Sequence, residues 1–122
     1  MSEIYFFDTY AIIEILKGSK NYDRFLNAKF VITVFNLVEL HYKLLRDFDE
    51  KIANSIMQKY SSYVVPISLD IIREANKFKL ENKSKNISVP DAMGYVTALK
   101  NNIKFVTGDE QFGKFKNVEF VK

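Results

Sequence analysis

The chain has no cysteine and no tryptophan, and only one histidine, two prolines and four glycines among its 122 residues. Without cysteine it has neither disulfides nor a thiolate metal site. The few glycines form no phosphate-binding loop and no dinucleotide fingerprint. No apolar run approaches the roughly 20 residues that span a bilayer. The amino-terminal segment also lacks the basic stretch that opens a signal peptide. We therefore expect a cytoplasmic protein.

What the chain does contain suits one compact core. Hydrophobic residues make up 48% of it, including eleven phenylalanines and seven tyrosines. The length is typical of one domain, which we place over residues 1–122. The net charge is +3, and lysine outnumbers arginine by fifteen to three. Lysine binds phosphate as a point charge but reads bases poorly, so this balance fits a sequence-independent attraction to a polyanion.

Short apolar runs alternate with helical stretches, which favours an α/β fold with a parallel sheet. The turn-rich segment 82–88 is our candidate for a mobile loop. Pro66 lacks an N–H group, so the strand that contains it belongs at a sheet edge. Asn36 is expected to cap the helix that follows it. The expected strands cover residues 4–7, 30–34, 63–67, 104–107 and 118–121, and the expected helices 9–16, 21–26, 37–46, 51–60, 69–80 and 90–100.

Four acidic residues stand where an expected strand gives way to a helix or loop: Asp8, Glu39, Asp91 and Asp109. Ligands of open α/β sheets bind beyond the carboxyl ends of the strands. Carboxylates gathered there repel one another by about 4 kcal/mol per pair at an effective dielectric near 20. A divalent cation removes that repulsion, and Mg²⁺ and Mn²⁺ prefer oxygen ligands. Metal-bound water attacks phosphodiesters, so the pattern predicts a metal-dependent nuclease.

Two of the four acids, taken alone, have a simple structural explanation. Asp91 at a helix start complements the helix dipole, and Asp109 is an ordinary turn residue. Glu39 and Asp8 lie among apolar neighbours, where a purely structural role explains a carboxylate poorly. The repetition of one topological pattern favours a shared function.

These residues also sit in motifs that resemble the PIN domain family, and in particular its VapC-type ribonuclease toxins. The motifs occur in the family's order across nearly the whole chain. They are Phe7-Asp8-Thr9, Asn36-Leu37-Val38-Glu39-Leu40, Pro90-Asp91-Ala92 and Thr107-Gly108-Asp109.

The resemblance implies a three-layer fold with a five-stranded parallel sheet between helices. It implies hydrolysis of RNA with one or two Mg²⁺ or Mn²⁺ ions, a homodimer, and inhibition by a cognate antitoxin. Asp8 and Asp91 are expected to ligate metal directly, Glu39 to ligate it or orient the attacking water, and Asp109 to act through water. The hydroxyls of Thr9 and Thr107 are expected to hold the carboxylates or a phosphate.

Some residues depart from the family or lie outside its motifs. Gln111 stands where relatives often carry another acid, which leaves the number of metal ions open. Tyr10 replaces a small polar residue. His41 follows Glu39 by two positions, about 200° round a helix, so it is expected to point away from the site. Lys83 and Lys85 in the loop are candidates for RNA contact, although a merely solvated loop explains them somewhat better.

Two alternatives remain open. The first is a catalytically inactive PIN-like domain that binds RNA or a protein. The second is a metal-dependent phosphatase with Asp8 as nucleophile. Such phosphatases usually carry a second aspartate two residues later, where this chain has Tyr10.

Overall fold

A parallel sheet forms the centre of the computed structural model, which describes residues 3–122. The sheet has four strands in the order β2-β1-β3-β4, and every neighbouring pair is parallel. The strands are β1 (Ile4–Phe7), β2 (Lys29–Val31), β3 (Lys104–Thr107) and β4 (Val118–Phe120). The predicted α/β class with a parallel sheet is thus confirmed.

The predicted sheet of five strands is wrong, because the strand expected over residues 63–67 does not form. This segment makes a single bridge, between Val64 and Ile32. The Ile32 N–H donates to the Tyr63 carbonyl at 3.0 Å, and the Val65 N–H donates to the Ile32 carbonyl at 2.9 Å. Pro66 then offers no further N–H, and β2 has already given way to a helix. Pairing therefore stops after one residue.

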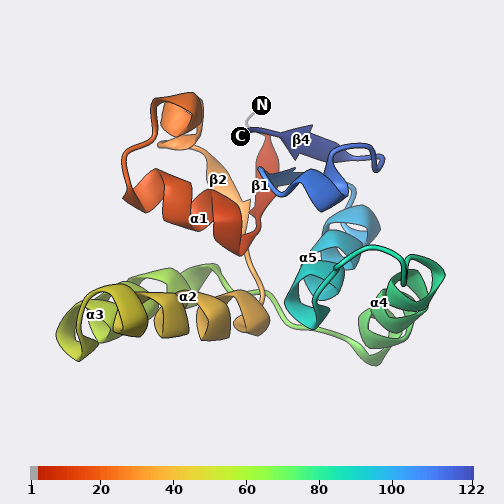
Figure 1. The fold of residues 1–122 in the computed structure, drawn as a ribbon, viewed down its shortest axis with the longest axis horizontal. Coiled ribbons are helices and arrows are strands. Elements are labelled where there is room, and N and C mark those ends of the chain that lie inside the picture. The colour runs from red at the N-terminus through yellow and green to blue at the C-terminus, as the bar shows by residue number, and fades with distance from the viewer. Residues whose placement is uncertain (1–2) are drawn as a thin grey trace.

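Along the chain, the helices occur in the connections between the strands, and in space they cover the sheet (Figure 1). Helix α1 follows β1, α2 to α5 separate β2 from β3, and short 3₁₀ turns fill three connections. The α-helices are α1 (Thr9–Leu16), α2 (Val34–Asp47), α3 (Glu50–Tyr60), α4 (Leu69–Glu81) and α5 (Val89–Lys100), and the 3₁₀ turns are η1 (Lys20–Phe25), η2 (Ser61–Tyr63) and η3 (Glu110–Phe112). Within the described residues, none of these helices is long and apolar enough to cross a bilayer.

The start of α2 also differs from the prediction. The helix begins at Val34, three residues earlier than expected, and Thr33 is its N-cap. Asn36 is inside the first turn, where its side chain and Thr33 form a capping box. A capping box satisfies N–H groups that the first turn leaves unpaired, so it extends the helix back to the end of β2.

Two apolar clusters, one on each face of the sheet, give the three layers. Successive strand residues point to opposite faces. Phe7 and Val106 accordingly pack in one cluster with residues of α1, α2 and α3, and Phe6 and Phe105 pack in the other with residues of α4 and α5. Figure 1 shows α1, α2 and α3 on one side of the strands and α4 and α5 on the other.

Helix α5 approaches the sheet closely at Gly94. A Cβ atom there would lie 2.7 Å from the Phe6 ring. The absence of a side chain at this position therefore lets α5 rest on β1 and fixes where its first turn, with Asp91, meets the strand ends.

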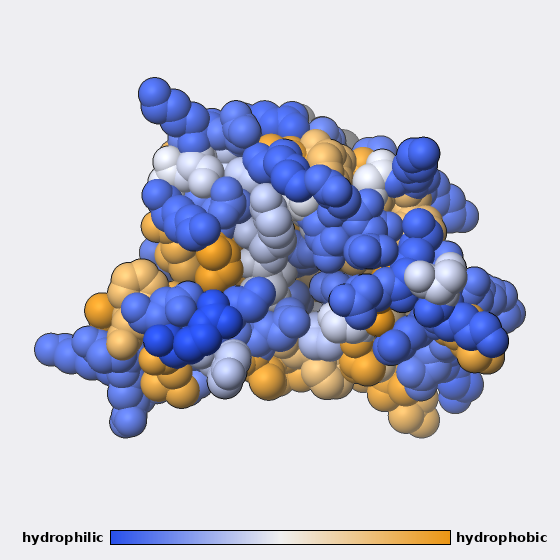
Figure 2. All heavy atoms as spheres, viewed as in Figure 1, coloured by the Kyte–Doolittle hydropathy of each residue, from blue (hydrophilic) through white to orange (hydrophobic). Residues whose placement is uncertain are grey.

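The surface in Figure 2 is largely hydrophilic. Hydrophobic side chains gather along its lower edge, over α2, α3 and α4.

Candidate active site

Asp8 joins the end of β1 to the start of α1. It is the N-cap of α1, and its Oδ1 accepts a hydrogen bond from the Ala11 N–H at 3.1 Å. Its Oδ2 accepts from the Thr107 hydroxyl, at the end of β3, at 2.7 Å. The side chain is only 3% exposed. Both carboxylate oxygens are thus fixed from neighbouring elements, and each keeps a lone pair for a ligand.

Glu39 is positioned by a chain of buried polar groups. The Thr9 hydroxyl donates to Glu39 Oε1 at 2.7 Å, and Asn36 Nδ2 donates to the Thr9 hydroxyl at 3.2 Å. Asn36 Oδ1 accepts from the Thr33 N–H at 2.8 Å and from the Thr33 hydroxyl at 3.0 Å. The capping box of α2 therefore also orients the Glu39 carboxylate through Thr9.

Asp91 and Asp109 reach the same region from two other elements. Asp91 lies in the first turn of α5, where its N–H donates to the Ser88 hydroxyl at 3.2 Å. Asp109 caps η3, and its Oδ1 accepts from the Gln111 N–H at 2.9 Å. Its own N–H donates to the Thr107 hydroxyl at 3.0 Å. Thr107 therefore links Asp8 to Asp109.

A cleft of about 500 Å³ brings these acids together at the carboxyl ends of the strands. Gly108 forms part of its wall, and a Cβ atom there would lie 2.5 Å from the Val121 carbonyl oxygen and 2.2 Å from the Tyr10 ring. The absence of a side chain at Gly108 therefore lets Tyr10 close this end of the cleft. The lining residues are Asp8, Thr9, Tyr10, Glu39, Lys43, Asp91, Gly108, Asp109, Glu110, Gln111 and Lys122.

The carboxylates act on one another. Burial raises the pKa of Asp8 from its ordinary 3.8 to about 7, against the lowering effect of the hydrogen bonds from Thr107 and Ala11. The charges of Asp91 and Asp109 raise it further. Burial also raises the pKa of Asp91 to about 6, with added repulsion from Glu39 and Asp109. The cleft therefore gathers carboxyl groups, two of which resist ionisation.

The donor chemistry of the cleft fits a hard divalent cation such as Mg²⁺ or Mn²⁺. Every candidate ligand is a carboxylate oxygen, and a nearby positive charge would favour the ionised form of Asp8 and Asp91. Over residues 3–122, however, no three acidic or histidine side chains form a group tight enough to hold a metal ion in this arrangement. The cleft thus suits a divalent cation by the type and charge of its ligands, and not by a preformed coordination site.

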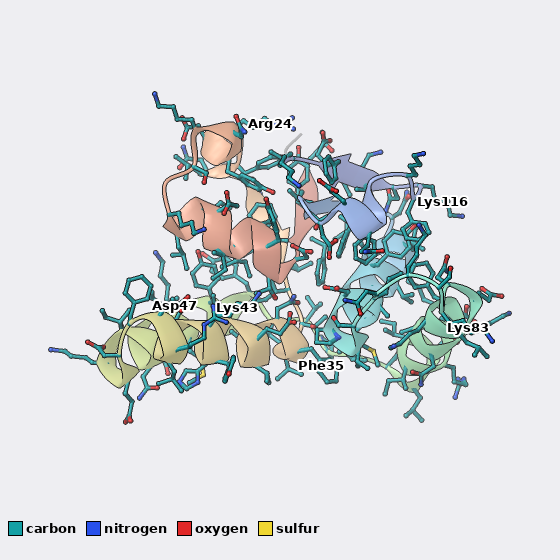
Figure 3. All side chains as sticks on the ribbon, viewed as in Figure 1. Arg24, Phe35, Lys43, Asp47, Lys83 and Lys116 are labelled. Atoms are coloured by element: carbon teal, nitrogen blue, oxygen red, sulfur yellow. The ribbon has the colours of Figure 1, made fainter. Side chains whose placement is uncertain are left out.

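Three residues considered from the sequence lie elsewhere. Lys83 and Lys85 line a separate pocket beside α4, and the Lys85 ammonium lies 5.6 Å from the centre of the Phe115 ring. Figure 3 shows Lys83 near α4, on the opposite side of the molecule from Lys43. His41 points away from the cleft, as expected, and its Nε2 lies 2.7 Å from Asn54 Oδ1.

The structure adds three residues to the surroundings of the acids: Asn36, Lys43 and Lys122. Lys43 and Lys122 line the cleft, and Asn36 supports Thr9 from beneath. Thr33 and Asn36 stand three apart, which is the spacing of a capping box, and Lys43 follows Glu39 by one helical turn. Both spacings are visible in the sequence. The position of Lys122 depends on how β4 ends, which no short motif encodes.

Comparison with known proteins agrees with this architecture. The sequence matches the PIN domain family over residues 5–118. The fold is similar to VapC20 of Mycobacterium tuberculosis, a toxin that cleaves the sarcin–ricin loop, with a TM-score of 0.77 and 20% identity over 98% of this chain and 100% of that chain. It is also similar to a toxin–antitoxin complex from Klebsiella pneumoniae, with a TM-score of 0.74 and 20% identity over 94% and 95% of the two chains.

A third similar structure is VapBC2 of Rickettsia felis bound to a promoter DNA fragment, with a TM-score of 0.73 and 21% identity over 98% and 99% of the two chains. No curated protein matches the sequence. The family match covers most of the chain and includes all four acids of the cleft. The chain belongs to the PIN domain family.

Proposed function

We propose that this PIN domain is a metal-dependent endoribonuclease and the toxin of a toxin–antitoxin pair. The observation that carries the proposal is the cleft at the carboxyl ends of the strands, where Asp8, Glu39, Asp91 and Asp109 meet from four segments. The raised pKa values of Asp8 and Asp91 support it. Burial first, and then the neighbouring carboxylates, disfavour the charged forms, which a bound divalent cation would stabilise.

Each polar residue of the cleft has a separate role in the proposed reaction. A bound Mg²⁺ or Mn²⁺ supplies a more acidic water and neutralises charge that develops on the phosphate oxygens. Asp8 and Asp91 would hold the ion directly, and Thr107 keeps Asp8 in place. Glu39, oriented by Thr9, ligates the ion or accepts a hydrogen bond from the attacking water. Asp109, whose Oδ1 accepts from Gln111, would act on the ion through a water molecule.

The proposal includes partners. Several similar structures are complexes of a toxin with its antitoxin, which supports a cognate antitoxin as a partner of this chain. The second proposed partner is RNA, the substrate of the proposed nuclease. We further propose a cytoplasmic homodimer in which residues 1–122 form one nuclease domain; the family match over residues 5–118 supports the single domain.

One observation favours a second candidate, a catalytically inactive PIN-like domain that binds RNA or a protein. This observation is the lack of a tight group of three potential metal ligands within the described part of the chain. A binder driven by lysine would hold RNA in the presence of a chelator, whereas a nuclease needs metal to cut it.

The decisive experiment is cleavage of a pooled RNA substrate by the purified protein, with Mn²⁺ or Mg²⁺ and with EDTA. We expect cleavage only with metal, and none by Asp8→Asn. Asp23→Asn is the matched control, because Asp23 is an exposed acid of η1 outside the cleft. If the folded wild-type protein binds RNA in EDTA but cuts none with either metal, the second candidate, an inactive binding domain, is the correct one.

A further inference from the structure

We propose that Lys43 binds a phosphate of the RNA next to the one that is cut, and so positions the strand in the cleft. This inference rests on the proposed nuclease function. Lys43 lies on the part of α2 that passes beneath α1 (Figure 3), is half-buried, and lines the cleft together with the four acids.

Lys43 carries a charge that no close ion pair neutralises in the described part of the chain. It acts on the exposed Asp47 only as the smallest of the positive charges that lower the pKa of that carboxyl, after Arg46 and Lys17. Its ammonium makes none of the ion pairs within 4.0 Å found over residues 3–122. Its two acidic neighbours one turn away on α2 have other partners. Glu39 accepts from Thr9 at 2.7 Å, and Asp47 accepts from the Arg46 guanidinium at 2.8 and 3.0 Å.

The other lysine of the cleft provides a contrast. The Lys122 ammonium forms an ion pair with Glu110. Lys122 must therefore give up a partner before it binds a phosphate, whereas Lys43 need not. Of the two lysines that line the cleft, Lys43 is the one available to an anionic ligand.

Lys43 is a poor candidate for a counter-ion that neutralises the acids of the cleft. The charges that act on Asp8 come from Asp91 and Asp109, and those that act on Asp91 come from Glu39 and Asp109. Lys43 lies one turn beyond Glu39, about 6 Å along the axis of α2. This displacement suits a neighbouring phosphate of a strand whose scissile phosphate lies at the acids.

The first test is binding of a short, labelled single-stranded RNA of random sequence, measured by fluorescence anisotropy in EDTA at several salt concentrations. We expect Lys43→Met to raise Kd by about threefold to tenfold and to lower the slope of log K against log salt by about 0.7, the value for one phosphate contact on a single strand. Lys43→Arg should keep both values near wild type. Lys59→Met, an exposed lysine on α3 outside the cleft, is the control.

The second test is steady-state cleavage with Mn²⁺. Lys43→Met should raise KM by a similar factor and leave kcat within about twofold, because a positioning contact binds substrate and transition state alike. If Lys43→Met matches Lys59→Met in both assays, or if Lys43→Arg fails to restore binding, the proposal is overturned. Absence of cleavage by the wild type would instead refute the nuclease, and the binding assay would still decide the role of Lys43.

Discussion

Asp8 serves three elements at once, because it ends β1, caps α1 and accepts a hydrogen bond from the last residue of β3. Its neighbours Thr9 and Thr107 use their hydroxyls in the same way, each fixing a carboxylate that belongs to a different segment. The acids are therefore held in place by short, local contacts even though like charges drive them apart. Their ionisation works against folding.

The first prediction concerns pH. The folded-state pKa values of Asp8, about 7, and Asp91, about 6, lie above the ordinary 3.8. The folded protein therefore binds more protons than the unfolded chain between these values, so its stability falls as pH rises through this window. In EDTA, we expect the free energy of unfolding to drop by about 2–4 kcal/mol between about pH 5 and about pH 7.5. Urea titrations at both pH values measure it.

Asp8→Asn should flatten this pH dependence, since asparagine still caps the helix but has no charge to desolvate. A wild-type protein that becomes more stable from about pH 5 to about pH 7.5 would contradict the proposed repulsion.

The second prediction separates the site from the scaffold. Asp91→Asn should lower cleavage by more than about a hundredfold, because the proposed nuclease would lose a metal ligand. Its melting temperature in EDTA should be unchanged or raised, since Ser88 caps α5 through the backbone N–H of residue 91. Asp70→Asn is the control for cleavage, because Asp70 also lies in the first turn of a helix, one position earlier in α4, and outside the cleft, where it pairs with Lys100. Strong destabilisation by Asp91→Asn would identify Asp91 as a structural residue.

Helix α2 shows how one element can serve both stability and the site. Its capping box begins the helix at the end of β2, and the same Asn36 side chain bonds the Thr9 hydroxyl that holds Glu39. Removal of the Asn36 side chain therefore affects Glu39 in the cleft through two hydrogen bonds, from Asn36 to Thr9 and from Thr9 to Glu39.

The third prediction follows from this arrangement. Asn36→Ala should cost about 1–3 kcal/mol of unfolding free energy, because it leaves the buried Thr33 N–H without its acceptor. Cleavage should fall as well, since Thr9 loses the donor that orients it. Asn54→Ala, which removes an exposed amide bonded to His41, should stay within about 0.5 kcal/mol of wild type. Equal urea midpoints for the two variants would argue against the network.

The elements that sequence patterns predicted well are those fixed by local chemistry. Strand β1 and helix α1 occur at the predicted residues, because a continuous apolar run ends at a carboxylate that caps the next helix. The start of α2 was misplaced, since Val34 favours a strand by propensity and only the Thr33–Asn36 box shows that the helix has begun. The predicted strand at 63–67 failed because one bridge beside Pro66 cannot extend.

For the molecule as a whole, the sequence indicated the gathering of the acids, and the structure confirms that all four line one cleft. A parallel sheet aligns its strand ends, so a motif after each strand implies a shared edge. The lysines could not be placed in this way. The polar loop around Lys83 and Lys85 made them candidates for RNA contact, yet these lysines line another pocket. The cleft is lined by Lys43 and Lys122, whose positions depend on the rotation of α2 and on the end of β4.

The fourth prediction concerns metal and the stability of the whole chain. A ligand that binds only the folded state raises the free energy of unfolding, by about 2.7 kcal/mol when its concentration is a hundred times Kd, and with it the melting temperature. Saturating Mn²⁺ at about pH 7.5 should therefore raise the melting temperature by roughly 5–10 °C. Scanning calorimetry of wild type and Asp8→Asn checks it, and only the wild type should respond. An equal rise in both proteins would place the ion outside the cleft.

The burial and mutual repulsion of the cleft carboxylates have a consequence for laboratory evolution of this chain. Selection for expression or heat resistance alone favours whatever relieves the repulsion, and the smallest such changes are neutral residues at positions 8 and 91. A library screened only for stability should therefore accumulate inactive members. Recovery of active, stabilised variants needs a screen that includes the divalent ion, under which the same carboxylates become an advantage.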